Sequence, residues 1–232
     1  MLEMTERMIG NSGIERQPPA SECSDMTLKV TDHAPRTPCF TSGTLVATEQ
    51  GPVLIEELRA GDRVLTRDNG YRPILWIGSR HFDSEELDRY AELQPIVIAK
   101  GALGPDAPSC DMKVSPHHRM LLTGSQALGF GNETEILAAA IDLTGFPGIC
   151  QTKQDSVTYF HLMFEEHEII RADGCWTESF LPEASVLDHM SRAQRHEILT
   201  IFPELAFADG IDAYEPARLC VGRQSNQLAL AA

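Results

Sequence analysis

From residue 39 the chain reads Cys39-Phe-Thr-Ser-Gly-Thr-Leu-Val-Ala-Thr48, and two residues later it continues Gly51-Pro-Val-Leu-Ile-Glu-Glu-Leu-Arg-Ala-Gly-Asp-Arg-Val-Leu-Thr66. Both segments contain short apolar runs of strand length, and Ala60-Gly-Asp62 is a turn signal between two of them. Similar runs separated by turns follow along the chain, so we expect an all-β domain. The further runs of strand length are residues 74–77, 94–98, 120–122 and 157–164.

Two later segments combine apolar residues with histidines. The first reads Val114-Ser-Pro-His-His-Arg-Met-Leu121, and the second reads Tyr159-Phe-His-Leu-Met-Phe-Glu-Glu-His-Glu-Ile-Ile-Arg-Ala-Asp-Gly174. Residues 157–164 alternate well enough to predict a strand, and residues 167–171 are predicted to be its hairpin partner.

Together, these segments resemble the Hint domain, which inteins share with the hedgehog autoprocessing domain, and they are most similar to its bacterial branch. The family pattern has a Cys at the cleavage point and later a Thr-x-x-His motif, which Ser115-x-x-His118 resembles. The resemblance covers residues 39–181 and implies a compact Hint-type β fold. Three elements of the first segment match the pattern position by position: Gly43-Thr44, Ile55-Glu-Glu-Leu58 and Gly61-Asp62.

The resemblance also implies the site residues. Cys39 stands at the cleavage point, and His161 falls where many members carry a catalytic Asp. His167 falls on a histidine of the family pattern, and Asp173 stands in the turn where Asn is usual. We therefore expect catalytic roles for Cys39, Ser115, His118 and His161, and supporting roles for His167 and Asp173.

The chemistry can also be argued from the residues. A thiol can attack the carbonyl that precedes it, if a donor polarises or twists the amide and an acid protonates the leaving amine. Cys39 supplies the thiol for attack on Pro38, and Ser115 and His118 are candidates for the other two roles. His161 could deprotonate the thiol or assist turnover of the thioester. His117 and His118 would alternate across a strand, and the register with Ser115 favours His118 as the one that faces the site.

The end of the matched region departs from the intein pattern. Inteins finish with His-Asn, whose Asn cyclises, but Glu178 and Ser179 stand at those positions here. We therefore expect cleavage of the Pro38–Cys39 bond on the N-terminal side, without splicing. The partners would be the chain's own N-terminal segment as substrate and water or a thiol as the resolving nucleophile.

The sequence also bears on two other functions. Proline hinders the carbonyl before Cys39, and 38 residues are too few for a folded cargo, so an inactive Hint-fold binding or structural module is the alternative. A conventional hydrolase acting in trans is disfavoured, because neither a Gly-x-Ser-x-Gly nor a His-Glu-x-x-His motif occurs.

Three of these residues could in principle bind a metal. Cys39, His118 and His161 have side chains that zinc favours, but the covalent role accounts for them, so we expect no metal or cofactor. The remaining histidines are read as solvated or local: His33, His81, His189 and His196.

The segments outside residues 39–181 differ from that region in composition. Residues 1–38 are rich in Pro, Ser and acidic residues and predict a flexible leader, with one short strand at 26–30. Residues 182–232 predict a helical or loose extension. Within it, residues 188–202 predict a helix that packs Met190, Ile198 and Phe202 on the β domain, and the last 20 residues are expected to be loose. Helical patches are further predicted at residues 84–93 and 133–143.

Composition excludes several classes of protein. The chain has 232 residues, is 42% hydrophobic and carries a net charge of −15, so it can build a core but should not bind nucleic acid. No apolar run reaches the roughly 18 residues of a membrane span. The six scattered cysteines fit a reducing compartment. Residues 1–7 do not resemble a secretory signal, so we expect a cytoplasmic protein or export without a classical signal peptide.

Overall fold

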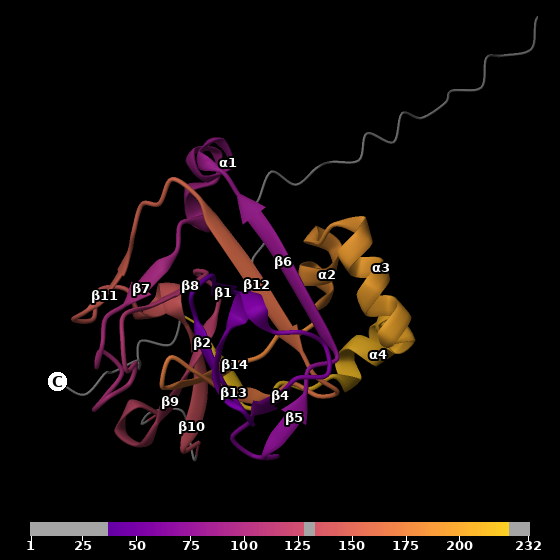
Figure 1. Cartoon of the computed structure of the whole chain (residues 1–232), viewed down its shortest axis with the longest axis horizontal. Coiled ribbons are helices and arrows are strands. Elements are labelled where there is room, and N and C mark those ends of the chain that lie inside the picture. Colours follow the sequence, from indigo (N-terminus) through magenta and orange to yellow (C-terminus); the bar gives the residue numbers. More distant parts are fainter. Residues whose placement is uncertain (1–36, 128–132, 223–232) are drawn as a thin grey trace, which may run out of the picture. The chain divides into compact units, whose positions relative to one another are not determined.

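The computed structural model describes residues 37–127 and 133–222 (Figure 1). Their strands form two sheets, in which neighbouring strands are antiparallel except for β10 and β15. The first sheet has six strands in the spatial order β11 (Ile149–Gln151), β7 (Ile96–Ile98), β8 (Met112–Val114), β1 (Phe40–Thr41), β12 (Val157–Met163) and β6 (Trp76–Phe82).

The second sheet has nine strands. Eight of them follow one path, and β3 (Gly51–Leu54) pairs with β2 beside it. The order along the path is β15 (Leu219–Val221), β10 (Glu135–Ala139), β9 (Arg119–Thr123), β14 (Cys175–Glu178), β13 (Ile169–Ala172), β2 (Leu45–Thr48), β4 (Arg63–Leu65) and β5 (Tyr71–Pro73). The predicted β domain with a short C-terminal helical extension is confirmed.

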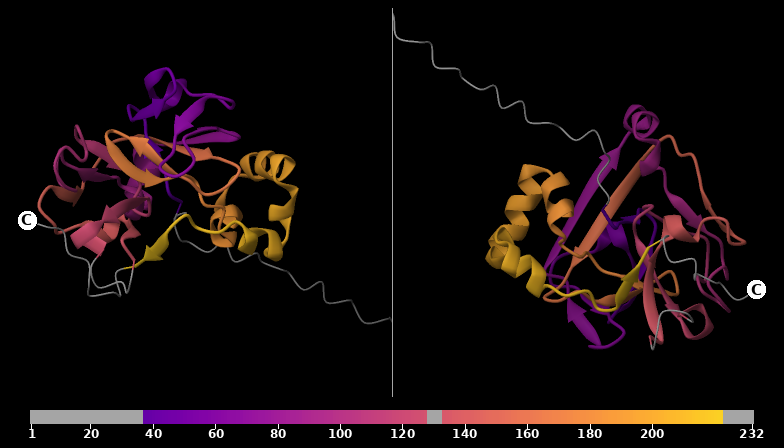
Figure 2. Two further views of the ribbon diagram at one scale, coloured as in Figure 1. Left: turned by 90° about the horizontal axis from the view of Figure 1, so that it is seen from below. Right: turned by 180° about the vertical axis from the view of Figure 1, so that it is seen from behind.

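The described residues also form four α-helices, and three of them form a group between strands β14 and β15. Figures 1 and 2 show α2–α4 gathered beside strand β6. A separate core of apolar side chains, centred on Trp76, Phe180 and Ile198, joins these helices to the β domain. The helices are α1 (Ser84–Arg89), α2 (Ala184–His189), α3 (Arg192–Ile201) and α4 (Ala208–Ala213). Short 3-10 helices span Ile55–Glu57, Ala91–Leu93, Gly124–Ala127, Ala140–Leu143 and Pro203–Ala206.

The predicted hairpin between residues 157–164 and 167–171 is wrong. Strand β12 pairs with β1 on one side and with β6 on the other, so it has no free edge for β13. Strand β13 instead lies in the second sheet and pairs with β14. Asp173 and Gly174 make the tight turn of that hairpin, with φ angles of 46° and 77°. Two successive residues with positive φ are typical of the turn that matches the twist of a β-hairpin.

The helical patch predicted at residues 133–143 is also wrong. Residues 135–139 form β10, and Ile136, Leu137 and Ala138 are all fully buried. β10 lies between β9 and β15, so both its edges are paired. A strand with both faces covered reads as a continuous apolar run, which periodicity alone cannot distinguish from a buried helix. The patch at 84–93 is confirmed as α1 followed by a 3-10 turn.

The C-terminal extension differs in detail from its prediction. Instead of one helix over 188–202, α2 ends before Met190, and α3 begins after Ser191, whose hydroxyl accepts a hydrogen bond from Gln194 N at 3.2 Å. This N-cap starts a new helix and breaks the expected one. Residues 219–221, expected to be loose, form β15. Residues 1–36 and 223–232, including the strand predicted at 26–30, lie outside the described residues.

Ile198 and Phe202 are buried as predicted, which gives a test of how the extension is held. Ile198 is fully buried in the core around Trp76. We expect Ile198→Ala to lower the free energy of unfolding by about 2–5 kcal/mol, because it removes buried apolar atoms and leaves a cavity. Ile201, on the same helix, is 43% exposed, so Ile201→Ala is the matched control, with a loss below about 1 kcal/mol. Equal urea midpoints for the two variants would contradict this packing.

Candidate active site

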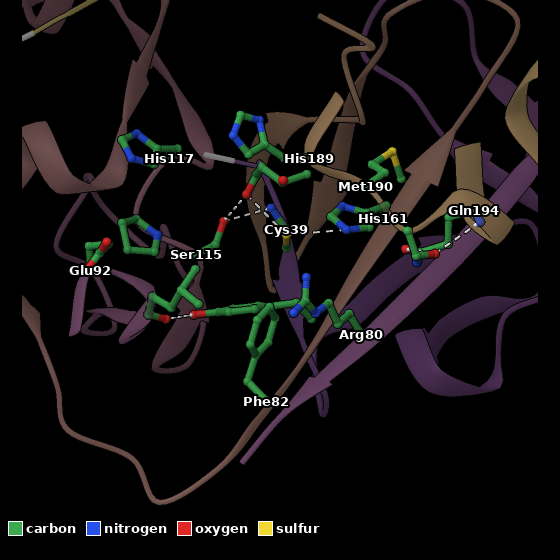
Figure 3. A pocket seen from close by; sticks show the side chains of 15 residues that line it. Cys39, Arg80, Phe82, Glu92, Ser115, His117, His161, His189, Met190 and Gln194 are labelled. Atoms are coloured by element: carbon green, nitrogen blue, oxygen red, sulfur yellow. Dashed lines mark hydrogen bonds between the residues drawn. The ribbon is translucent and has the colours of Figure 1, made fainter. Parts of the chain in front are cut away.

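The register of strand β1 brings three predicted site residues together. Phe40 pairs with Phe160 of β12 on one side and with Val114 of β8 on the other. In an antiparallel pair the next positions are opposite each other, so Cys39 lies between Ser115 and His161. Opposite residues project to the same face of a sheet. Figure 3 shows Ser115 and His161 on either side of Cys39.

Ser115 holds the peptide unit at Cys39. Its Oγ accepts a hydrogen bond from Cys39 N at 2.9 Å and donates one to the carbonyl oxygen of Thr37 at 2.8 Å. Its backbone N–H donates to the carbonyl oxygen of Cys39 at 2.9 Å. The hydroxyl of Ser115 therefore fixes the N–H of the Pro38–Cys39 amide. The carbonyl groups of Thr37 and Cys39, on either side of that amide, are also bonded to Ser115.

His161 contacts both atoms that would react. Its Nδ1 lies 3.0 Å from the carbonyl oxygen of Pro38, and its Nε2 lies 3.6 Å from Cys39 Sγ. A carbonyl oxygen can only accept, so Nδ1 carries the hydrogen and donates it. Burial lowers the pKa of His161 to about 4, although the bond to Pro38 opposes this shift. The ring is therefore neutral at pH 7, and Nε2 presents a lone pair to the thiol.

The Cys39 thiol is buried and protonated at neutral pH. Burial raises its pKa well above the usual range, and the hydrogen bond with Ser115 only partly opposes that shift. Sγ also lies 3.1 Å from the carbonyl oxygen of Thr37. The single thiol hydrogen therefore has two acceptors, Thr37 O and His161 Nε2. Of these two, only the imidazole can take the proton away.

His118 lies away from the thiol. The sequence placed Ser115 and His118 on one strand, but His118 N donates to Ser115 O at 3.1 Å, so residues 115–118 form a turn between β8 and β9. Its ring packs edge-on against Phe40, with centroids 4.4 Å apart. His118 Nε2 is 2.5 Å from Thr177 Oγ1, and that hydroxyl donates to the carbonyl oxygen of Arg119.

These contacts fix the state of His118. Because the Thr177 hydroxyl donates elsewhere, it accepts from Nε2–H, and Nδ1 keeps its lone pair. Nδ1 is buried and has no hydrogen-bond partner among residues 37–127 and 133–222. Burial lowers the pKa of His118 to about 4. A group that is neutral at pH 7 is a poor proton donor, which disfavours the predicted role of His118 as the acid.

The two predicted supporting residues have structural contacts. His167 accepts a hydrogen bond at Nδ1 from Ala217 N at 2.9 Å, and its Nε2 donates to the carbonyl oxygen of Ser179 at 3.2 Å. Asp173 occupies the turn of the β13–β14 hairpin and accepts from Leu45 N at 2.9 Å. His167 therefore ties the C-terminal segment to the sheet, and Asp173 stabilises a turn.

Glu178 forms a buried charged group that the sequence did not identify as functional. Its Oε1 accepts from Arg119 N at 2.7 Å, and its Oε2 accepts from the Arg119 guanidinium at 3.0 Å. Burial alone would raise the pKa of Glu178, but the hydrogen bond with His167 and the charge of Arg119 outweigh it, so the pKa is lowered. The ionised carboxylate partly offsets the effect of burial on His118. Glu178 stands between two polar residues, Thr177 and Ser179, so the local sequence gave no signal of this buried charge.

A pocket opens at Cys39 (Figure 3). His117 lines it and His118 does not, which differs from the preference drawn from strand alternation, because residues 115–118 turn instead of running straight. His189, read as local from the sequence, also lines the pocket, and its Nδ1–H donates to the carbonyl oxygen of Ser185. The junction of α2 and α3 supplies one wall: His189, Met190, Ser191 and Gln194.

Within residues 37–127 and 133–222, no three His, Cys, Asp or Glu side chains are grouped so that they could hold a metal ion. None of the helices in that part of the chain has the length and apolar character that crossing a membrane requires.

The family model described as "Hint domain" matches residues 38–184, which is more than half of the chain. A comparison with curated proteins gives no match.

Several solved structures are similar. The AceL NrdHF class 3 split intein, a GSH-linked splice-inactive variant, has 17% identity and a TM-score of 0.42, with 61% of this chain and 97% of that chain covered. A bacterial intein-like domain from Clostridium thermocellum has 14% identity, a TM-score of 0.38 and coverages of 61% and 97%. A DnaB intein from Synechocystis sp. has 10% identity, a TM-score of 0.40 and coverages of 61% and 98%.

Proposed function

Because the chain belongs to the Hint domain family, we propose that it is an autoprocessing domain that activates its own Pro38–Cys39 peptide bond by an N–S acyl shift. One observation carries the proposal. The neutral imidazole of His161 lies against the two reacting partners at once, with Nδ1 on the Pro38 carbonyl oxygen and Nε2 facing the Cys39 sulfur. A single side chain can therefore polarise the electrophile and activate the nucleophile.

In the proposed step, His161 Nε2 takes the thiol proton as Sγ attacks the Pro38 carbonyl carbon. Negative charge develops on the carbonyl oxygen, where Nδ1–H and the newly formed imidazolium stabilise it. The C–N bond then breaks, and the imidazolium returns the proton to the departing nitrogen of Cys39. The products are a thioester between Pro38 and Cys39 Sγ and a free α-amine. The proton lost from sulfur is the one gained by nitrogen, so no other reactant is needed.

Resolution of the thioester would release residues 1–38. Water or an external thiol attacks the thioester carbonyl, and the Cys39 thiolate leaves. Glu178 and Ser179 stand where inteins have His-Asn, and both carboxylate oxygens of Glu178 accept hydrogen bonds from Arg119. The proposed reaction therefore ends with cleavage on the N-terminal side, and the chain from Cys39 onward stays intact.

The alternative is an inert Hint module that binds or supports another segment. The specific observation in its favour is the burial of Cys39, which raises the pKa of the thiol and disfavours the thiolate. The two functions differ in whether a thioester forms. Hydroxylamine converts a thioester to a hydroxamate, so the experiment is to incubate folded protein with it and measure the mass of the released peptide. Residues 1–38 ending in a Pro38 hydroxamate support autoprocessing, and full-length protein without adduct supports the inert module.

Pro38→Gly is expected to speed cleavage by roughly tenfold, which corresponds to about 1.4 kcal/mol of activation free energy. The proline ring fixes φ and crowds the carbonyl that Sγ must approach, whereas glycine leaves it open. The measurement is the rate of loss of intact mass in matched samples of the variant and the parent protein. A slower Pro38→Gly variant would mean that the ring holds the carbonyl in its reactive position instead of hindering it.

A further inference from the structure

Ser115, Cys39 and His161 lie opposite one another across the first sheet, and the next strand beyond His161 is β6. The position opposite His161 on β6 is Gly78. A Cβ at this position would lie 2.3 Å from two ring atoms of Trp76. The indole of Trp76 therefore lies directly over Gly78, in the space that any other residue would fill with its own side chain. Gly78 lets the indole reach the side of His161.

Two aromatic rings enclose His161. The Trp76 ring is nearly parallel to the imidazole, with centroids 6.2 Å apart and an interplanar angle of 12°. The Phe180 ring meets the imidazole edge-on, with centroids 5.4 Å apart. Trp76 and Phe180 are 4% and 2% exposed. These rings keep water from the imidazole on the sides that do not face Pro38 and Cys39.

Helix α3 fixes the indole from outside. Trp76 Nε1 donates a hydrogen bond to Glu197 Oε2 at 3.0 Å. Gln194, one turn earlier, donates to the carbonyl oxygen of Ser79 at 3.2 Å. Both contacts join α3 to β6 on the two sides of Gly78. The helix lies beyond residue 184, where the family match ends.

We propose that Glu197 is a positioning residue for His161 and acts through the indole of Trp76. The inference rests on the proposed function, because it assigns part of the autoprocessing machinery to the C-terminal extension. Without the acceptor on Glu197, the indole N–H loses its partner and the ring loses the contact that fixes its orientation. Water then reaches the imidazole, and the contacts of His161 with Pro38 and Cys39 become less populated.

The titration of His161 reports this effect directly. Burial is what lowers its pKa, so water entry should raise the pKa toward the ordinary value near 6.5. Loss of the negative charge on Glu197 would act in the opposite direction and lower it. The sign of the change therefore separates positioning from charge. Other titratable or charged groups line the pocket with His161 or act on it, and they stay the same in the comparison: His118, Arg80, His117, His189, Glu92 and Tyr159.

The experiment is an NMR titration of His161 in Cys39→Ala protein, which cannot cleave itself. We expect the titration midpoint of the parent to lie near pH 4 and that of Glu197→Ala to lie about one pH unit higher. Glu197→Gln keeps an acceptor oxygen but loses the charge, so its midpoint should not rise and should lie at or slightly below that of the parent. Arg192→Ala changes an exposed residue of the same helix and is the matched control. Trp76→Phe keeps a ring but lacks the N–H, so it should behave like Glu197→Ala.

Two results would overturn the inference. One is an unchanged midpoint in folded Glu197→Ala and Trp76→Phe proteins. The other is a midpoint lowered equally in Glu197→Ala and Glu197→Gln, which would mean that only the charge matters. Because the titration uses a chain that cannot cleave, it remains valid if the proposed function fails. In the cleaving chain, Glu197→Ala should shift the acid limb of the rate profile up by about one pH unit, because His161 acts in its neutral form.

Discussion

Cys39→Ala is expected to abolish the release of residues 1–38. Alanine has no nucleophile, and no other thiol in the described part of the chain lines the pocket beside Pro38. The substitution leaves the backbone contacts intact, because Ser115 bonds the backbone N–H and carbonyl of residue 39, which alanine also has. The fold should therefore survive, and a thermal unfolding curve close to that of the parent would separate loss of chemistry from loss of structure.

Cys39→Ser is expected to have an intermediate effect, between those of the parent and Cys39→Ala. A hydroxyl is a weaker nucleophile than a thiol at neutral pH, so slow cleavage through an ester is expected. Mass spectrometry over several days distinguishes the three proteins. If Cys39→Ala released the same fragment at the parent rate, cleavage would come from another nucleophile or from a contaminating protease, and the assignment of Cys39 would be wrong.

The second large effect is expected at His161. His161→Gln should slow cleavage by roughly 10²–10⁴-fold, because an amide can still donate to the Pro38 oxygen but cannot take the thiol proton. The pH dependence follows from the same contacts. Burial lowers the pKa of His161 to about 4, so the neutral form is present above that pH and the cleavage rate should fall only as the pH drops through it.

His118→Ala provides the comparison for His161→Gln. His118 contacts Thr177 and Phe40 and does not line the pocket, so its removal should cost less in rate than the change at His161. Both rates are measured by loss of intact mass at pH 7. If His118→Ala were the slower variant, the proton transfer would run through His118 and the geometry at His161 would be incidental.

Part of this site could be predicted from the sequence. Cys39, Ser115 and His161 stand in local motifs, and the register of β1 with β8 and β12 places them in one row. The double contact of His161 could not be predicted, because it depends on the rotamer and tautomer of one ring in a folded environment. Trp76 and Glu197 belong to no motif, and only the packing of α3 against β6 brings them to His161.

The two wrong predictions about the fold, for residues 157–171 and 133–143, have a common cause. Strand length and alternation identified β12, but they carry no information about which edge is free, and β12 has both edges occupied. For β10 the apolar run hid its strand character, because its three central side chains are fully buried on both faces of the sheet. The turn at Asp173 was predictable because positive φ favours Asn, Asp and Gly at such positions. Pairing partners and turn register are decided by tertiary contacts, which local patterns do not report.

The most direct measurement is the intact mass of freshly purified, folded full-length protein, followed over days with and without dithiothreitol. Thiol should accelerate the loss of residues 1–38 and leave a chain that begins with Cys39, because thiolate attacks the thioester at Pro38. Pro38→Gly protein is incubated in the same way, because it should still cleave if proline only slows the reaction in the parent. If both proteins keep their full mass with thiol present, no thioester forms, and the Hint fold of this chain serves as an inert module.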